Sequence, residues 1–326
     1  MTAESGKDEC RICDDPRQYV PPEGQRFTTL RKMREKPPVA SHESFGEGGY
    51  GSGGNDVKYK NVWWQDEVEK QMWSVRTEPQ VSNVASSHFS PDLLTRRQFA
   101  IGNRAELIQT SAGNILWDLI PYLDEDTVNK INELGGLKAI VISHPHYYST
   151  YADWSRTFQC PVYVGKPDRE WLERSTEPGV DVRFLTAFNT PILEGSGATA
   201  ILAGGHFPGS LLLHWRQNLF IADTIFPVPS AFDPEPGRPG KISFTFFWSI
   251  PNRIPLHPDD ILTIWHLVKP LEFHTAFGAF KGMDIRTMGN EASRGTGGVK
   301  GRLLESCKIY VKAMGWEKHG MLSATI

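Results

Sequence analysis

Residues 137–149 read Leu-Lys-Ala-Ile-Val-Ile-Ser-His-Pro-His-Tyr-Tyr-Ser. The apolar run at 137–142 predicts a short buried strand, and it leads directly into His144 and His146. Side chains two residues apart in an extended chain point to the same side, so both imidazoles can converge on one ion. Because a single histidine is more often a hydrogen-bonded structural residue, this pair alone does not establish a metal site.

Three other stretches contain a histidine or an aspartate that could also bind a metal ion. His206 lies in Ala-Gly-Gly-His-Phe-Pro-Gly-Ser at 203–210, and Asp223 ends the apolar run in Asn-Leu-Phe-Ile-Ala-Asp-Thr at 218–224. Earlier in the chain, Asn-Ile-Leu-Trp-Asp ends in Asp118. Imidazole and carboxylate groups are among the ligands that zinc takes from proteins, so these stretches favour a metal centre.

The order of these motifs resembles the metallo-β-lactamase superfamily. In that family a strand runs into an HxHxDH loop, a GHTPG-like turn follows, and a later strand ends in an aspartate; the matching motifs here lie within residues 98–224. A subgroup with an N-terminal Cys-x-x-Cys and an HPH followed by aromatics is similar over roughly residues 10–34 and 95–317. The resemblance implies an α/β fold, an αββα sandwich of two mixed sheets flanked by helices.

The resemblance also implies a ligand set. It carries His144, His146 and His206 onto the first metal site and Asp223 onto the position that usually bridges two metals. Tyr148 and Ser149 replace the local aspartate and histidine of the second site. Three neutral imidazoles and a carboxylate suit Zn²⁺, so we expect one zinc ion, with a second ion or iron as alternatives.

Three further residues receive roles by the same resemblance. His274 lies where the family places its last second-site histidine, so it is a candidate ligand for a weak second metal; otherwise it orients a substrate or packs on the sheet. Asp118 would orient a ligand histidine. Tyr148 would donate a hydrogen bond to an oxyanion, or would pack with Tyr147 as a plain aromatic. His214, on an alternating strand, is expected to be structural.

The function that these expectations favour is metal-dependent hydrolysis of a small molecule. A metal-bound hydroxide would attack the carbonyl of a lactam, a lactone or a thioester, with Asp223 binding the metal or taking the proton. Two alternatives remain open. One is a mononuclear iron enzyme that oxidises sulfur compounds with His144, His206 and Asp223, and the other is a non-catalytic binding protein.

Composition narrows the classes of partner. The chain has 326 residues, 39% of them hydrophobic, which is enough to bury a sizeable core. A formal net charge of −3 gives no indication of a nucleic-acid or anionic-membrane partner. No apolar stretch reaches the length of a membrane helix, and the first ten residues lack a signal-peptide core, so a cytoplasmic protein is predicted. The oligomeric state is left open.

The chain divides at about residue 98. Residues 1–97 are interpreted as an irregular extension that contains Cys10, Cys13 and a glycine-rich loop at 46–54, and residues 98–326 as the metallo-β-lactamase-like domain. The two cysteines are half of a zinc site, a redox pair or packed residues. Residues 59–73 are expected to form a short helix over the core, and 98–103 a strand.

Beyond residue 103 the patterns are regular. Strands are predicted at 104–110, 115–119, 137–142, 162–164, 182–185, 198–203, 210–215 and 219–222, and helices at 124–134, 149–158, 167–174, 258–268 and 302–313. The proline-rich stretch 226–241 is expected to lie over the metal. Phe244, Phe246, Phe247 and Trp248 are expected to pack in the core or to form an apolar wall for the substrate.

Overall fold

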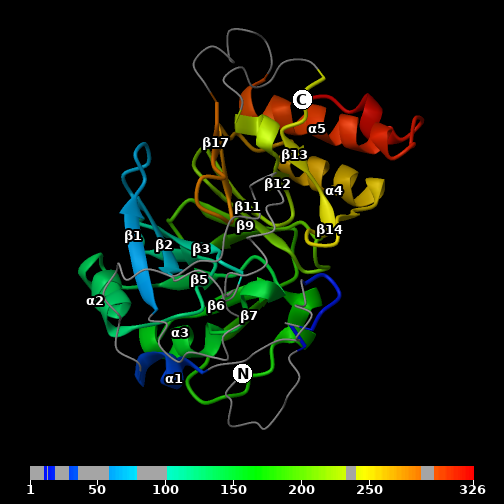
Figure 1. Cartoon of the computed structure of the whole chain (residues 1–326). Helices are drawn as coiled ribbons and strands as arrows, with labels where there is room; N and C mark the ends of the chain where they lie inside the picture. The colour runs from blue at the N-terminus through cyan, green and yellow to red at the C-terminus, as the bar shows by residue number, and fades with distance from the viewer. Residues whose placement is uncertain are drawn as a thin grey trace, which may run out of the picture.

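The computed structural model describes residues 11, 12, 14–18, 29–35, 59–78, 101–232, 240–287 and 297–326. Most of its strands belong to two large mixed sheets (Figure 1). The first contains, in spatial order, β1 (Lys60–Gln65), β2 (Met72–Glu78), β3 (Arg104–Ile108), β4 (Ile115–Trp117), β5 (Ala139–Val141), β6 (Val162–Gly165) and β7 (Val182–Leu185). The second contains β17 (Ile285–Arg286), β16 (Thr275–Gly278), β11 (Asn218–Ala222), β10 (Leu211–Trp215), β9 (Ala198–Leu202) and β8 (Asn189–Ile192).

Helices and short ribbons complete the described chain. The α-helices are α1 (Leu30–Glu35), α2 (Glu125–Glu133), α3 (Tyr151–Phe158), α4 (Pro258–Val268) and α5 (Gly298–Ala313). Short 3₁₀ helices are η3 (Pro145–Tyr147), η4 (Lys166–Trp171), η5 (Pro229–Phe232) and η6 (Gly320–Ser323). Two small ribbons pair β12 (Phe226–Pro227) with β13 (Phe244–Thr245), and β14 (Phe247–Ser249) with β15 (Ile254–Pro255). No helix in the described ranges has the length and apolar character that a bilayer crossing requires.

The central strands of both sheets are buried on both faces, and the alternation of their side chains separates three layers of core. In β5 and the residue after it, Val141 faces the second sheet, while Ile140 and Ile142 face α2 and α3. In β10, Leu212 packs against α4 and α5 on the opposite side of the molecule, whereas its neighbours Leu211 and Leu213 point between the sheets. This period of two confirms the predicted αββα sandwich, with α2 and α3 at one end of the molecule and α4 and α5 at the other (Figure 1).

Residues 59–73 differ from expectation, because they begin a β-hairpin instead of forming a helix. β1 and β2 pair antiparallel, and β2 pairs with β3 of the main sheet. Asp66 closes the turn, where its carboxylate accepts hydrogen bonds from the backbone N–H groups of Val68 (2.9 Å) and Glu69 (2.7 Å). Aromatic residues such as Trp63 and Trp73 suit a pleated, half-buried surface. Residues 60–78 therefore belong to the sandwich and not to an irregular extension.

Some sequence-based expectations lie outside the described residues, and others differ from the observed elements. Cys10, Cys13, the loop at 46–54 and residues 98–100 lie outside them. Residues 101–103 are described and form no strand. The predicted helix at 167–174 is the shorter 3₁₀ helix η4.

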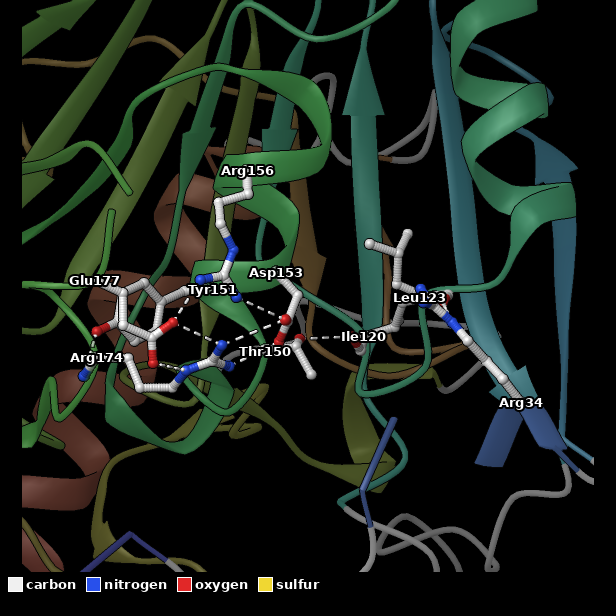
Figure 2. A network of polar contacts seen from close by, with 9 residues as sticks. All are labelled: Arg34, Ile120, Leu123, Thr150, Tyr151, Asp153, Arg156, Arg174 and Glu177. Atoms are coloured by element: carbon white, nitrogen blue, oxygen red, sulfur yellow. Dashed lines mark hydrogen bonds and ion pairs between the residues drawn. The ribbon is translucent and has the colours of Figure 1, made fainter. Parts of the chain in front are cut away.

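A polar network fixes α3, the helix that follows His144-Pro-His146 (Figure 2). The Thr150 hydroxyl donates to the Ile120 carbonyl oxygen (3.1 Å), which ties the start of α3 to the loop after β4. The Tyr151 phenol oxygen accepts from the Arg174 backbone N–H (2.8 Å), and Arg174 pairs with Asp153 (2.7 Å). The Thr150 bond is buried, whereas the Asp153 side chain of the ion pair is partly accessible to solvent, so the Thr150 bond is the better-protected anchor. It holds the loops of His144 and Asp118 together.

A close approach between two glycines positions the turn that contains His206. Gly165 ends β6, and a Cβ atom added to it would lie 2.0 Å from the Gly209 carbonyl oxygen. The Gly209 backbone N–H donates to the buried Asp168 carboxylate (2.7 Å). The first sheet therefore holds the C-terminal end of the 206–209 turn by a backbone contact that leaves no room for a side chain.

We expect Gly165→Ala to lower the free energy of unfolding by about 1–3 kcal/mol, because overpacking forces the backbone to shift. Gly320→Ala is the matched control, since a Cβ there meets only Leu262 at an ordinary 3.7 Å. Urea unfolding of the two variants and the wild type measures the difference. Equal stability of all three proteins would show that the turn at 206–209 is free to move away from β6.

Candidate metal centre

Four strands deliver polar residues to one edge of the sandwich. β4 and β5 are parallel neighbours with Trp117 opposite Val141, so Asp118 and His144 follow them on the same side. In the second sheet β9 and β10 form a hairpin whose connection contains His206, and β11 runs antiparallel to β10 and ends next to Asp223. The ends of strands from both sheets therefore meet at one place.

The structure brings His144, His146, His206 and Asp223 together. One ligand atom from each lies within 4.8 Å of the others. All four side chains are buried, with relative exposures between 0 and 9%. The Asp223 Oδ2 atom is 3.4 Å from His144 Nε2 and 4.0 Å from His206 Nε2, and His206 Nε2 is 3.4 Å from His146 Nδ1.

Hydrogen bonds on the far side of two rings orient them. His206 Nδ1 is 2.9 Å from the carbonyl oxygen of Phe247, which can only accept, so Nδ1 carries the proton and Nε2 offers a lone pair. His144 Nδ1 is 2.8 Å from the Ser143 hydroxyl. Ser143 in turn donates its backbone N–H to Asp118 Oδ1 (2.7 Å), and its side chain also bonds this carboxylate. Asp118 therefore acts on His144 through Ser143 and not by direct contact.

The protonation states match those of metal ligands. Burial lowers the pKa of His206 to about 4 and that of His146 well below its ordinary value, and the neighbouring imidazoles act in the same direction. The pKa of Asp223 is lowered although burial opposes this, because His144, His206 and the Tyr147 hydroxyl stabilise its charge. The neutral imidazoles of His146 and His206 and the ionised carboxylate of Asp223 are in the protonation states in which such groups bind a divalent cation.

This donor set fits Zn²⁺. His144 Nε2 is buried and makes no hydrogen bond within the described residues, and it faces the other ligand atoms of the cluster, with Asp223 Oδ2 at 3.4 Å. A buried polar atom without a partner is costly, and a cation between the four ligand atoms would satisfy it. Three nitrogens and one oxygen are a common set for zinc, and the same atoms also suit iron.

Tyr147, and not Tyr148, reaches the cluster. The Tyr147 hydroxyl donates to Asp223 Oδ1 at 3.1 Å, and its ring lies 4.5 Å from the His144 ring, centroid to centroid. Tyr148 packs in the core near Tyr151, and no described group hydrogen-bonds its hydroxyl. Of the two roles expected for Tyr148, the structure agrees with the packing aromatic. Tyr147 takes the place beside His144 because His144 caps the 3₁₀ helix η3, in which residues three apart are eclipsed.

The structure does not bring His274 to the centre. β16 runs parallel to β11, with Thr275 opposite Asn218 and Gly278 opposite Ala222. His274 precedes β16, so it lies at the end of the sheet opposite Asp223, and its side chain is exposed. This corrects the expectation of a second-site ligand. Ser149, the other second-site position, is also exposed.

Arg17 is a contact residue that sequence reasoning missed. Its guanidinium lies over the Phe207 ring (4.2 Å) and over the Trp248 ring (4.4 Å), and its Nε donates to the His206 carbonyl oxygen (3.0 Å). Asp15 holds the other side of the guanidinium at 3.0 Å. A lone arginine 189 positions before His206 gives no sequence signal, because the contact exists only in the fold. The segment around Arg17 therefore belongs to the site.

The aromatic residues at 244–248 are expected either to pack in the core or to form an apolar wall, and the structure divides them into two groups. Phe244 and Phe246 are buried in the core beside α4 and α5. Phe247 and Trp248 are half-buried and contact the His206 turn, one by its carbonyl oxygen and the other through Arg17. Of the proline-rich stretch 226–241, residues 233–239 lie outside the described residues.

Two of the six described non-glycine residues with positive φ angles lie beside the centre. Asp118 and Ala222 are non-glycine residues with positive φ angles of 59° and 43°. Such conformations cost of order 1–3 kcal/mol each and persist only where the surroundings impose them. Asp118 bonds Ser143, and Ala222 directly precedes Asp223, so both strained residues help to place groups of the cluster.

Comparison with known proteins gives a curated relative, and several solved structures are similar to part of the chain. The chain is 34% identical over 277 residues to the uncharacterized protein YmaE of Bacillus subtilis (strain 168), an alignment that covers 83% of this chain and 81% of YmaE. No family model matches the chain.

Among solved structures, the metallo-β-lactamase DIM-1 exposed to ceftazidime is similar with a TM-score of 0.48 and 12% identity, over 77% of this chain and 97% of DIM-1. The mono-zinc form of the metallo-β-lactamase FIM-1 from Pseudomonas aeruginosa is similar with a TM-score of 0.46 and 12% identity, over 79% of this chain and 97% of FIM-1.

We expect His206→Ala to lose most of its metal, because it removes one of three imidazoles. The affinity should fall by more than the roughly 10–100-fold that follows loss of an outer hydrogen-bond partner. His214→Ala is the control, since His214 Nε2 bonds the Glu272 carbonyl oxygen (2.9 Å) away from the cluster. Elemental analysis after dialysis measures both variants. Equal metal content in the two variants would remove His206 from the ligand set.

Arg17→Met should release metal to a chelator about fivefold faster, which corresponds to the roughly 1 kcal/mol of a partly buried cation–π contact. The reason is that the side chain anchors the turn containing His206. Arg11→Met is the control, because Arg11 lies over Trp171 (5.3 Å) and its polar contacts are to exposed Glu170, an ion pair with the carboxylate (2.7 Å) and a hydrogen bond to the carbonyl oxygen (2.8 Å). Stopped-flow release from the full chain gives the rates. A rate unchanged by Arg17→Met would show that the anchor has no influence on the centre.

Proposed function

The chain belongs to the family of Bacillus subtilis YmaE, and we propose that it is a metal-dependent hydrolase of the metallo-β-lactamase superfamily. The observation that carries this proposal is the buried convergence of His144, His146, His206 and Asp223 at the edge of an αββα sandwich. The ordered sequence motifs around these four residues support the same assignment. The likeness to solved structures supports the fold alone.

The proposed roles follow from the contacts. His144, His146 and His206 hold a single Zn²⁺, and the Asp223 Oδ2 atom completes the protein ligands. When bound, the ion supplies a Lewis acid for a carbonyl group and makes a water molecule acidic near neutral pH. Asp118 contributes indirectly, because its carboxylate orients Ser143 and thereby the lone pair of His144.

The proposed substrate is a small molecule with an activated carbonyl: a cyclic amide, a lactone or a thioester. Hydrolysis of such groups requires one electrophilic activator and one deprotonated water, which a centre with a single ion supplies. The half-buried Phe247 and Trp248 beside the His206 turn give the neighbourhood of the centre an apolar and aromatic character. This character suits a compact, largely apolar substrate.

The decisive experiment combines metal analysis with a hydrolysis screen on the full chain. We expect between one half and one and a half zinc ions per chain, because Tyr148 is in the core and Ser149 is exposed. At least one lactam, lactone or thioester should be hydrolysed, and His206→Ala should abolish the activity.

Three outcomes would contradict the proposal. Two tightly held ions per chain would refute the single-ion centre. Iron with visible colour in anaerobically purified protein would favour the sulfur-oxidising alternative, which uses His144, His206 and Asp223. A blank screen with fully metallated protein would favour a non-catalytic binding protein.

A further inference from the structure

The two oxygen atoms of the Asp223 carboxylate have different partners. Oδ2 faces the ligand nitrogens, at 3.4 Å from His144 Nε2 and 4.0 Å from His206 Nε2. Oδ1 accepts a hydrogen bond from the Tyr147 hydroxyl at 3.1 Å. The side chains of Asp223 and of its three partners are buried, so water does not compete freely for either carboxylate oxygen.

A second contact, between the rings of Tyr147 and His144, fixes the position of the phenol. Its ring packs against His144, with the centroids 4.5 Å apart and the planes inclined by 58°. Tyr147 and His144 are three residues apart on the turn that contains η3, so the phenol and the imidazole are held together by local backbone geometry. The phenol therefore contacts one metal ligand with its ring and a second with its hydroxyl.

We propose that Tyr147 is a positioning residue that makes Asp223 a one-oxygen ligand: its hydroxyl holds Oδ1 and leaves only Oδ2 for the ion. The inference rests on the metal centre of the proposed function, but it does not require hydrolysis. In a centre with two ions a carboxylate at this place would share its oxygens between them. Here the Tyr147 hydroxyl engages one lone pair of Oδ1 and fixes the carboxylate orientation, which disfavours coordination of an ion by this oxygen.

The neighbouring tyrosine provides an internal comparison. Tyr148 is equally buried and adjacent in sequence, but its ring packs in the core beside Tyr151 and its hydroxyl bonds no described group. Both Tyr→Phe substitutions remove one oxygen atom from a buried ring. Only Tyr147→Phe removes a hydrogen bond to a metal ligand.

The test titrates metal-free full-length wild type, Tyr147→Phe and Tyr148→Phe with Co²⁺ and Zn²⁺. We expect Tyr147→Phe to weaken the affinity about 10–100-fold, as loss of a hydrogen bond to a ligating group typically does. Its cobalt absorption spectrum should change in intensity and position, because a released carboxylate alters the coordination number. Tyr148→Phe should match the wild type in affinity and spectrum. A folded Tyr147→Phe protein with wild-type affinity and spectrum would overturn the proposal.

A double-mutant cycle tests whether Tyr147 acts through Asp223. In an Asp223→Ala background, Tyr147→Phe should cause no further loss of cobalt affinity, since the shared interaction is already absent. An undiminished loss in that background would refute the proposed route. These measurements follow binding alone, so a blank hydrolysis screen leaves their result intact.

Infrared spectroscopy of the wild type gives a test that is independent of any variant's folding. The difference spectrum on Zn²⁺ binding isolates the carboxylate that becomes a ligand. A widened separation between its two stretching bands is expected for binding through one oxygen. A narrowed separation, which indicates binding through both oxygens, would overturn the proposal.

Discussion

The burial of three imidazoles and one carboxylate within 4.8 Å of each other is the constraint on which this structure depends. Polar groups removed from water cost several kcal/mol unless they find partners. In His144 and His206 the Nδ1 atom points away from the cluster and has a protein partner. The Nε2 atoms point inward, toward the other residues of the cluster. Such an arrangement is stable when a cation occupies the space between them, so the folding of the loops and the binding of metal are coupled.

The sandwich supplies the rigidity that this constraint requires. The two sheets contribute different residues to the cluster, His144 and His146 from the loop after β5 and His206 and Asp223 from the second sheet. The alternating core between the sheets fixes their separation, and the contact of Gly165 with Gly209 fixes one loop against the other sheet. The distances between the four residues of the cluster therefore depend on the packing between the two sheets.

Groups around the cluster determine the orientation of its imidazole rings and of the Asp223 carboxylate. The Phe247 carbonyl and the Ser143 hydroxyl set the direction of two ring lone pairs, and Tyr147 engages one oxygen of Asp223. Arg17 closes the outer side between Phe207 and Trp248. The four inner residues provide donor atoms, whereas these outer groups determine tautomer, orientation and surrounding charge.

The sequence by itself determined the layered fold and the members of the cluster. The apolar strand patterns at 137–142 and 219–222 are local properties, and His144 and Asp223 lie just beyond the ends of those two strands. Only the tertiary structure decided that Tyr147 and not Tyr148 faces Asp223, because the direction of a side chain depends on the 3₁₀ geometry of η3. Strand register likewise placed His274 at the far end of β16. Arg17 and the β1–β2 hairpin joined the domain through contacts that are distant in sequence, and no local pattern encodes such contacts.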